Sequence, residues 1–455
     1  MSLLSILPAQ MRADARPSFA ALLHHVRRKR AHPALLVYYR WAALMVVLNV
    51  AVAVSGWSSG WLLRADAATL GRLSLIAQLN LVLGTLVRQQ HVVNLLSAVA
   101  TRAPVTWPLS VRWALGKVHH LGGVHIGAAI GGSVWYLFFA VGVARAGIRD
   151  EGTVTGANVL LSLVIGVLLV SLCALAMPPV RRRAHDVFEV SHRIGGWSLL
   201  VAVWINAVVF VAHQRPDEPV IRVLLTSPTT LLVLLSTALA VEPWLRLRRV
   251  AVTVERPSDH AAVVRLAHGS PPPIGSTRAI SRSAVLGWHS FANVPAAPGE
   301  DGYRMLVSRA GDWTSELIDE PPTHVWVRGT PVVGVANARK LFRRVVFVAT
   351  GSGIGPLLGH VLADQGNGHL IWVTRNPVRT YGADLVNEIL GARPDADVWD
   401  TSQRGKPDLF ELALQAVRDT GAEAVICVAN QQVTWQVVQG LEARGIPAFG
   451  AIWDS

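Results

Sequence analysis

The chain has 455 residues, of which 51% are hydrophobic and only 16% are charged, whereas about 25% are charged in ordinary soluble domains. Its formal net charge is +13, but the basic residues cluster at the edges of apolar runs, as membrane topology signals do. They do not form the single patch that would favour nucleic acid as a partner. The two cysteines, Cys173 and Cys427, lie in different parts of the chain. Neither a disulfide framework nor a Cys-x-x-Cys metal site is therefore expected.

Apolar runs long enough to cross a lipid bilayer, about 20 residues each, fill the first half of the chain. They predict six membrane-spanning helices, at 34–54, 67–87, 114–143, 156–177, 194–213 and 222–243. Basic residues precede the first run and follow the second, fourth and sixth, so both termini are expected in the cytoplasm. No signal peptide is expected, because the stretch before Arg27 is polar and mixed. The sequence thus predicts a multi-pass protein of the cell (inner) membrane, with a cytoplasmic segment at 1–33 and a transmembrane domain at 34–249.

Two clusters of histidines lie near the cytoplasmic ends of the third and fifth predicted spans. The first contains His119, His120 and His125. The second contains His185 and His192, which are two helical turns apart and therefore share one face of a helix. Ionisable groups are costly at membrane depth, and neutral imidazole is the usual axial ligand of haem iron. The clusters predict an iron site, and the alternative is that the histidines pack near headgroups or form hydrogen bonds within the bundle.

The second half of the chain reads as two soluble units. Residues 250–335 contain short β-like runs separated by Pro and Gly, which predict a small barrel or sandwich. In residues 336–455 strands alternate with helical stretches, which predicts a parallel sheet. The first strand of this unit runs directly into a glycine-rich turn, composed of Thr350, Gly351, Ser352, Gly353, Ile354, Gly355 and Pro356. Glycines let the backbone approach a pyrophosphate, and the helix N-terminus that follows favours its charge, so a nucleotide phosphate site is predicted here.

Arg375 follows the second predicted strand of the parallel sheet. At that position it either contacts the adenosine ribose or a 2′-phosphate of the nucleotide, or is a solvated loop arginine. The sequence leaves both interpretations open.

The layout of the chain resembles the ferric reductase and NADPH oxidase superfamily. Residues 288–295 are similar to its His-Pro-Phe-Thr flavin motif, residues 311–314 match its Gly-Asp-Trp-Thr segment, and residues 351–356 match its nicotinamide phosphate loop. A subgroup of ferric-reductase-like transmembrane flavoproteins of fungi and bacteria is most similar. It is marked by His-His-x-Gly-Gly-x-His, by the segment from Phe188 to Trp197, and by the ending Gly-Ala-Ile-Trp-Asp-Ser.

The resemblance implies a six-helix membrane bundle followed by a ferredoxin–NADP reductase-like module, with a flavin-binding β-barrel at 250–335 and an NAD(P)-binding α/β domain at 336–455. It implies that FAD is bound by His289, Ser290, Phe291, Gly311, Asp312, Trp313 and Thr314. His289 and Trp453 would lie at the reacting flavin, with ordinary packing as the alternative for Trp453. NADPH or NADH would be bound by Thr350, Gly351, Ser352, Gly353, Gly355, Pro356 and Arg375. A single haem b would lie between His119 or His120 and His192, with His125 and His185 nearby.

Departures from the superfamily pattern narrow this expectation. Fourteen residues after the histidines, where the superfamily has ligands of an outer haem, this chain has Ser133, Val134 and Asn206, so the outer haem is predicted to be absent. The nicotinamide-site Cys-Gly-Pro is replaced around residues 428–430, and the Gly-Pro-x-Gly of the flavin–nicotinamide junction is reduced to residues 329–331.

The sequence therefore predicts a membrane-bound, flavin-dependent NAD(P)H oxidoreductase. Electrons would pass from NAD(P)H via FAD to a site on the cytoplasmic side of the membrane, and on to an iron chelate, a quinone or a lipophilic small molecule. One alternative is a membrane binding or transport protein whose degenerate reductase domain serves as a nucleotide sensor. A further alternative keeps the enzyme but places a non-haem metal at the histidines.

Overall fold

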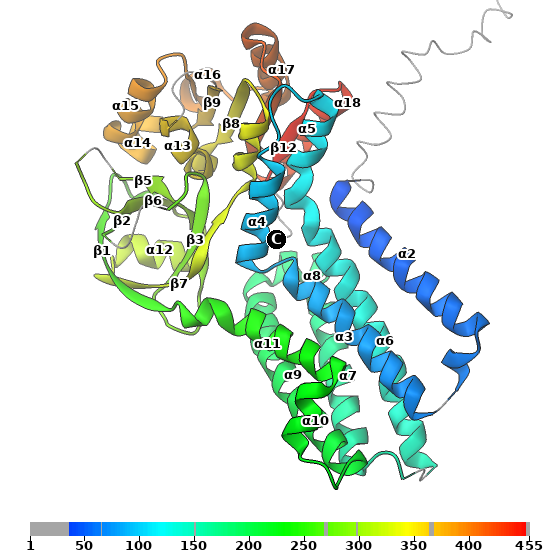
Figure 1. Cartoon of the computed structure of the whole chain (residues 1–455). Helices are drawn as coiled ribbons and strands as arrows, with labels where there is room; N and C mark the ends of the chain where they lie inside the picture. Colours follow the sequence, from blue (N-terminus) through cyan, green and yellow to red (C-terminus); the bar gives the residue numbers. More distant parts are fainter. Residues whose placement is uncertain are drawn as a thin grey trace, which may run out of the picture.

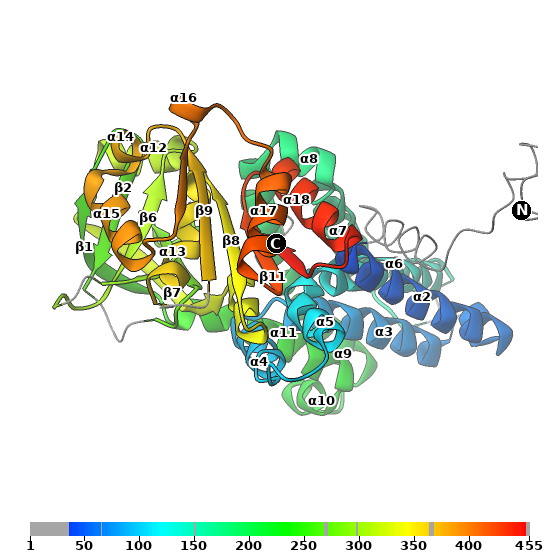
Figure 2. The same cartoon turned by 90° about the horizontal axis from the view of Figure 1, so that it is seen from above.

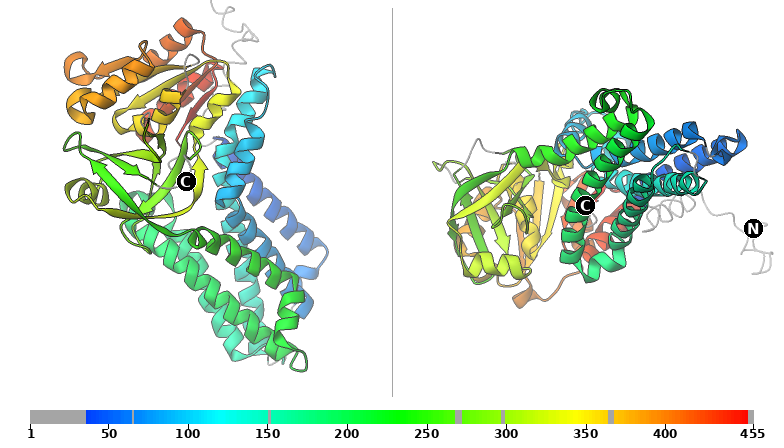
Figure 3. Two further views of the ribbon diagram at one scale, coloured as in Figure 1. Left: turned by 60° about the vertical axis from the view of Figure 1, so that its left-hand side comes forward. Right: turned by 90° about the horizontal axis from the view of Figure 1, so that it is seen from below.

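The structure, a computed structural model, describes residues 36–64, 66–149, 152–267, 272–296, 299–363 and 368–451. The predicted cytoplasmic segment at 1–33 and the predicted flavin residue Trp453 lie outside these ranges. A long helical bundle carries two β-containing domains at one of its ends (Figures 1 and 3).

Within the described ranges, six helices are long and apolar enough to cross a membrane. The bundle helices are α2 (Val37–Ser58), α3 (Ala67–Leu86), α6 (Gly122–Ile148), α7 (Gly156–Leu175), α9 (His185–Gln214) and α11 (Pro228–Leu245). Shorter helices connect them: α4 (Gln90–Ala100), α5 (Leu109–Gly116), the 3-10 turn η5 (Lys117–Leu121), α8 (Pro178–Arg183) and α10 (Val220–Thr226). Large apolar side chains such as Val167 on α7 and Val201 on α9 are exposed on the outside of the bundle, as in helices that meet lipid.

Helix α6 is the centre of the bundle. Small residues allow it to approach its neighbours closely, since a Cβ at Gly123 would overlap the carbonyl oxygen of Tyr38 on α2 and one at Gly127 would lie 2.6 Å from Met45 Cβ. Trp135 and Phe139, both on α6, are fully or nearly buried among α3 and α7. The third apolar span is longer than predicted, because α5, η5 and α6 continue one another over Leu109–Ile148.

The first β domain is a seven-stranded antiparallel sheet. Its elements are β1 (Arg248–Glu255), β2 (Ala261–Leu266), β3 (Ser276–Ser281), β4 (His289–Ala292), β5 (Val294–Pro295), β6 (Tyr303–Ser308), α12 (Asp312–Asp319) and β7 (His324–Val333). The strand order is β4-β3-β7-β1-β2-β6-β5. Strands β4 and β5 are the two edges, yet only Asn293 separates them, so the sheet curls until its edges are adjacent. In the described part no ladder joins β4 to β5, so the predicted closed barrel stays a prediction.

The second β domain contains the parallel sheet that the sequence predicts. Its strands are β8 (Val345–Thr350), β9 (Gly368–Thr374), β10 (Asp397–Asp400), β11 (Ala424–Val428) and β12 (Ala448–Gly450), in the order β10-β9-β8-β11-β12. Around them lie η6 (Val335–Leu341), η7 (Gly351–Gly353), α13 (Ile354–Ala363), α14 (Pro377–Tyr381), α15 (Ala383–Ala392), α16 (Thr401–Arg404), α17 (Leu409–Thr420) and α18 (Gln431–Ala443). Helices α13 and α15 cover one face and α17 and α18 the other (Figure 2). The chain order reverses between β8 and β11, which creates a switch point where such folds bind ligands.

The segment Gln90–Lys117, here called the docking arm, attaches the β domains to the bundle. Asn94 donates to the carbonyl oxygen of Pro331 at 2.8 Å and accepts from the N–H of Val333 at 3.0 Å. Arg112 forms an ion pair with Glu423 at 2.7 Å. Lys117 pairs with Glu442 of α18 and donates to the carbonyl oxygen of Ala448 at 2.8 Å. A stretch that the sequence presents as a connection between spans is thus an interdomain brace (Figure 1).

Candidate functional site: a nucleotide cavity beside an aromatic strand

A cavity of about 1130 Å³ opens at the carboxyl ends of β8, β9 and β11, at the switch point of the parallel sheet. The predicted residues Thr350, Gly351, Ser352, Gly353, Pro356 and Arg375 all line it. Gly355 does not: it is buried next to Leu306 of the antiparallel domain and serves packing between the two domains. From the second half of the sheet come Val428, Ala429 and Asn430, and from the loop before α17 comes Lys406.

The glycine turn has the geometry that a phosphate loop requires. Gly351 adopts φ +49°, and its carbonyl oxygen accepts a hydrogen bond from Trp372 Nε1 at 3.0 Å. A Cβ at Gly353 would overlap the backbone carbonyl oxygen of Val428 on the neighbouring strand β11. Helix α13 begins at Ile354, directly after this turn, so its free N–H groups and positive dipole end are directed at the cavity. The turn therefore suits a pyrophosphate.

The rim around Arg375 is built by hydrogen bonds to one carboxylate. Asp400 accepts from the backbone N–H of Asn376 at 2.9 Å and from that of Ser402 at 2.8 Å. The Ser402 hydroxyl, followed by these backbone donors, holds the pKa of Asp400 below its usual value. Asn376 adopts φ +44°, which places the exposed Arg375 at the end of β9 facing the cavity.

Cys427 does not face the nucleotide cavity. It is fully buried in the core between β11 and the α17–α18 layer, and burial raises the pKa of its thiol to about 12. The thiol is therefore protonated and shielded at neutral pH. The position that the superfamily resemblance associates with nicotinamide is instead lined by Val428, Ala429 and Asn430.

The predicted flavin residues of β4 divide between the two faces of the strand. The rings of His289 and Phe291 lie against Trp313, at centroid separations of 4.4 Å and 5.8 Å. Ser290 is exposed on the opposite face, as strand alternation requires. Thr314 Oγ1 accepts hydrogen bonds from the N–H groups of Ala310 and Gly311 at the start of α12, at 2.9 Å and 3.0 Å. The structure thus brings His289, Phe291 and the segment from Gly311 to Thr314 together and separates Ser290 from them.

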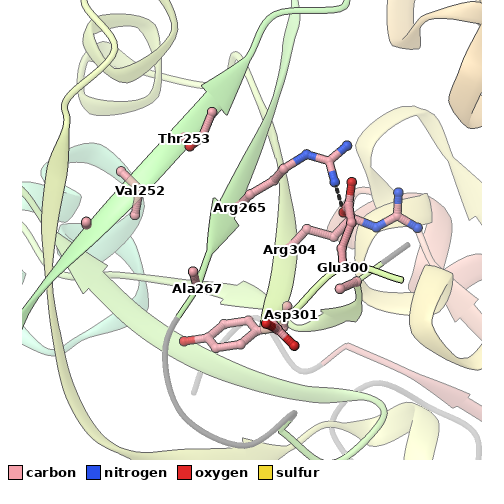
Figure 4. A pocket seen from close by; sticks show the side chains of 10 residues that line it. Val252, Thr253, Arg265, Ala267, Glu300, Asp301 and Arg304 are labelled. Carbon is pink, nitrogen blue, oxygen red and sulfur yellow. Dashed lines mark hydrogen bonds and ion pairs between the residues drawn. The ribbon is translucent and has the colours of Figure 1, made fainter. Parts of the chain in front are cut away.

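A second, smaller cavity of about 280 Å³ lies beside strands β1, β2 and β6 of the antiparallel domain (Figure 4). Its charges are matched within the protein. Arg265 pairs with Glu255 at 2.8 Å and also with Glu300, and Arg304 pairs with Glu388. No free cation is left on its described walls to attract an anionic ligand.

The bundle histidines lie at the end that faces the β domains. Nδ1 of His125 is 2.8 Å from the carbonyl oxygen of Gly84 on α3. His125 and His192 are close enough for their charges to interact, and both lie near Arg88. The pairing of His119 or His120 with His192 stays a prediction.

The remaining cluster members are placed as follows. Nε2 of His119 and Nδ1 of His120 are buried and have no hydrogen-bond partner in the described structure. His185 is the first residue of α9, and its side chain is outside what the structure describes. The described residues contain no group of three or more His, Cys, Asp or Glu that could hold a metal ion.

Two of the three positions where the superfamily has outer ligands carry polar side chains that are hydrogen-bonded within the bundle. Ser133 donates to the carbonyl oxygen of Ala129 at 2.8 Å, and Asn206 donates to Ser162 Oγ at 3.3 Å. Val134 is 45% exposed on the outer surface of α6.

Comparison with known proteins gives similarity to reductases. The family described as "Adenylate-forming reductase 03009, C-terminal domain" matches residues 335–455. Adenylate-forming reductases 06235 and 03009 of Coprinopsis cinerea are each 37% identical over 429 residues, which is 94% of this chain.

Solved structures with a similar arrangement include a ferredoxin NADP+ reductase from Neisseria gonorrhoeae with bound FAD and NADP, at 13% identity and a TM-score of 0.36 over 45% of this chain and 98% of that chain. A flavohemoglobin from Malassezia yamatoensis with bound FAD and heme aligns at 14% identity and a TM-score of 0.40 over 86% of this chain and 97% of that chain. The chain spans 41% of the length of each of the two Coprinopsis relatives that it matches.

Proposed function

We propose that the chain is an NAD(P)H-dependent flavin oxidoreductase of the cell membrane. The nicotinamide nucleotide binds in the cavity beside β8, FAD lies along β4 and the start of α12, and the six apolar helices cross the bilayer with both termini and the β domains on the cytoplasmic side. The observation that carries the proposal is the cavity at the switch point, where the Gly351–Gly353 turn meets the N-terminus of α13. The two relatives are named reductases, and the proposal takes only the reductase activity from them.

The residues at the edge strand suit a flavin. Strand β4 is an edge of the sheet and contacts α13, the helix that begins at the nucleotide cavity. Nε1 of Trp288, directly before β4, is buried and has no partner in the described structure, so an N–H donor is free beside the strand. His289, Phe291 and Trp313 supply aromatic surface. A bound FAD supplies the chemistry of accepting a hydride and releasing single electrons.

The histidines at the inner end of the bundle suit a haem b held between His125 and His192. The contact of His125 Nδ1 with the Gly84 carbonyl fixes the ring orientation and leaves Nε2 for a metal. Arg88 supplies a positive charge close to both rings. We infer that the electron acceptor, an iron chelate, a quinone or a lipophilic small molecule, is reached from this cytoplasmic side. A haem at this end of the bundle is what the resemblance to the ferric reductase superfamily implies.

An absorption spectrum of the detergent-purified protein before and after NADPH tests the whole proposal. We expect flavin bands that bleach with NADPH and a Soret band that shifts on reduction. His125→Ala and His192→Ala should each remove the Soret band, whereas His91→Ala should keep it, because His91 is exposed and pairs with Glu242. A protein without flavin bands contradicts the reductase, and a full Soret band in both variants contradicts the ligand pair.

A nucleotide sensor in a membrane binding or transport protein is the second candidate. It is favoured by one observation, the burial of Cys427 away from the cavity where the superfamily resemblance places a cysteine at the nicotinamide. The sensor binds NADPH with no oxidation of it by any acceptor. Turnover with ferricyanide as an artificial acceptor rules the sensor out.

The charge on the cavity rim predicts a preference for NADPH over NADH. Arg375 lines the cavity at the end of β9, where a 2′-phosphate of the nucleotide would lie, and Lys406 lies on the same rim. Loss of a charge-assisted hydrogen bond is worth about 1.5–3 kcal/mol, so Arg375→Ala should weaken NADPH binding about 10–100-fold and NADH binding little. Calorimetric titration measures both. Arg379→Ala is the control, since Arg379 is exposed on the adjacent α14 and does not line the cavity.

A further inference from the structure

The loop between β3 and β4 (residues 282–288), here called the β3–β4 loop, has an apolar tip. Val285 is 61% exposed and Leu286 is 43% exposed. In the described part of the two β domains the other large apolar side chains that are exposed are Ile274, Val378 and Leu390, which are scattered. Single exposed apolar residues are ordinary on protein surfaces, whereas two adjacent ones at a loop tip form a small apolar projection.

The backbone of this tip is fully hydrogen-bonded. The N–H groups of Val285 and Leu286 both donate to Ser283 Oγ, at 3.3 Å and 3.4 Å. The carbonyl oxygen of Leu286 accepts from Ser281 Oγ at 2.6 Å, and that of Val285 accepts from Arg193 Nη1 at 3.2 Å. Unsatisfied backbone groups are what keeps irregular loops out of a bilayer. This loop carries none at its tip.

The loop is tied to the bundle at a defined depth. Arg193 lies within the apolar span Val187–Gln214, about 9 Å along the helix from its start at 1.5 Å per residue. Its guanidinium also pairs with Glu189, one turn closer to the β domains. The one charged residue of the loop, Arg282, is drawn away from the tip by an ion pair with Glu316 of α12 at 2.6 Å.

Tryptophans surround the base of the loop. Trp288 packs on Trp244 of α11 with ring centroids 6.0 Å apart, and Trp244 packs on Trp197 of α9 at 6.3 Å. The guanidinium of Arg328 lies 4.6 Å from the ring centres of both Trp244 and Trp288, and burial there lowers its pKa to about 10. Tryptophans and snorkelling arginines are typical of the membrane–water interface.

We propose that the β3–β4 loop inserts Val285 and Leu286 into the headgroup layer of the cytoplasmic leaflet. The partner is a phospholipid surface, because the tip is bound to Arg193 of α9, beside the exposed apolar side chains of Val190 and Ile194. This inference rests on the membrane orientation of the proposed function. Because His289 follows Trp288 directly, the contact fixes the height of the flavin strand β4 above the bilayer.

Site-directed fluorescence in lipid nanodiscs tests the proposal. In a background in which Cys173 and Cys427 are replaced by alanine, single cysteines are introduced as Val285→Cys, Val201→Cys and Val378→Cys and labelled with bimane. Val201 is 57% exposed in the middle of α9, and Val378 is 53% exposed on α14 of the parallel domain. Each labelled protein is measured with nitroxide lipids that carry the quencher either at the headgroup or near the acyl-chain end.

A label at position 285 should lose about half of its fluorescence to headgroup quenchers, because inserted groups lie within about 5–10 Å of the acyl boundary, and little to acyl-end quenchers. A label at position 378 should lose little to either. Adding Leu286→Asp should restore the fluorescence at position 285. Quenching at 201 by acyl-end lipids without quenching at 285 overturns the loop insertion alone. The absence of quenching at position 201 overturns both the loop insertion and the membrane orientation. Neither result depends on NADPH oxidation.

Discussion

Gly353→Val is expected to abolish nucleotide binding while the bundle and the antiparallel domain stay folded. A side chain at this position collides with the backbone carbonyl oxygen of Val428, and a backbone atom of a central strand cannot move aside as a flexible side chain can. Overpacking a tight site costs about 1–3 kcal/mol, and displacement of the phosphate turn adds to it, so the Kd for NADPH should rise at least about 100-fold. Calorimetric titration measures it.

Gly391→Ala is the matched control, because a Cβ at the end of α15 meets no atom within 4 Å. Its Kd should equal that of the unmodified protein. The flavin-to-protein ratio and circular dichroism check that Gly353→Val is folded. An unchanged Kd in a folded Gly353→Val protein would show that the nucleotide does not use this turn.

Arg112→Met should weaken the contact between the docking arm and the parallel domain. The Arg112 side chain is 4% exposed, pairs with Glu423 at 2.7 Å and donates to the carbonyl oxygen of Leu341 at 2.8 Å. Glu423 is 21% exposed, so its carboxylate keeps part of its contact with water when Arg112 is removed, and loss of the charge-assisted hydrogen bond costs about 1.5–3 kcal/mol. We expect a lower midpoint of thermal unfolding and faster hydrogen exchange in η6 and β11. Arg344→Met is the control, since Arg344 is exposed and donates only to the carbonyl oxygen of Thr420.

The pH dependence of this pair has a definite sign. The hydrogen bond from Arg112 is the largest cause that lowers the pKa of Glu423 below its ordinary value of 4.5. A group whose pKa is lowered on folding stabilises the protein above its unfolded pKa, and that stabilisation is lost as the pH falls through the folded value. The difference in unfolding midpoint between the unmodified protein and Arg112→Met should therefore be constant near neutral pH and shrink below about pH 4.5. A constant difference down to pH 3 would contradict the role of Glu423.

Several features of the fold could be predicted because their signals are local. Apolar runs of the right length indicate helices, and the glycine turn after a strand of Val and Phe indicates the site at β8. The parallel sheet follows from the alternation of strands and helices. These are properties of a dozen or two consecutive residues, and the structure places Thr350 to Gly353 and Arg375 around one cavity as expected.

The rest depends on contacts between distant residues. The docking arm could not be predicted from the sequence, because Arg112, Lys117 and Asn94 bind partners that lie more than 200 residues away along the chain. Strand alternation, which separates Ser290 from His289, could have been foreseen from the period of two. The proximity of His125 to His192 could not, because it depends on how α6 and α9 are placed relative to each other.

The docking arm also restricts the motion of the two β domains relative to each other. Gln90 accepts a hydrogen bond from the N–H of Thr330 at 2.8 Å, Asn94 brackets Pro331 and Val333, and Ser97 binds Asn337 at 3.1 Å. Thr330, Pro331 and Val333 lie at the end of β7, and Asn337 lies in η6, which leads to β8. Two domains joined by a single link can rotate relative to each other. Here the end of β7 and the segment η6 are hydrogen-bonded to α4, which opposes that rotation. Under the proposed function, both domains are already in register when the nucleotide binds, and the docking arm sets the distance between the flavin strand β4 and the bundle histidines.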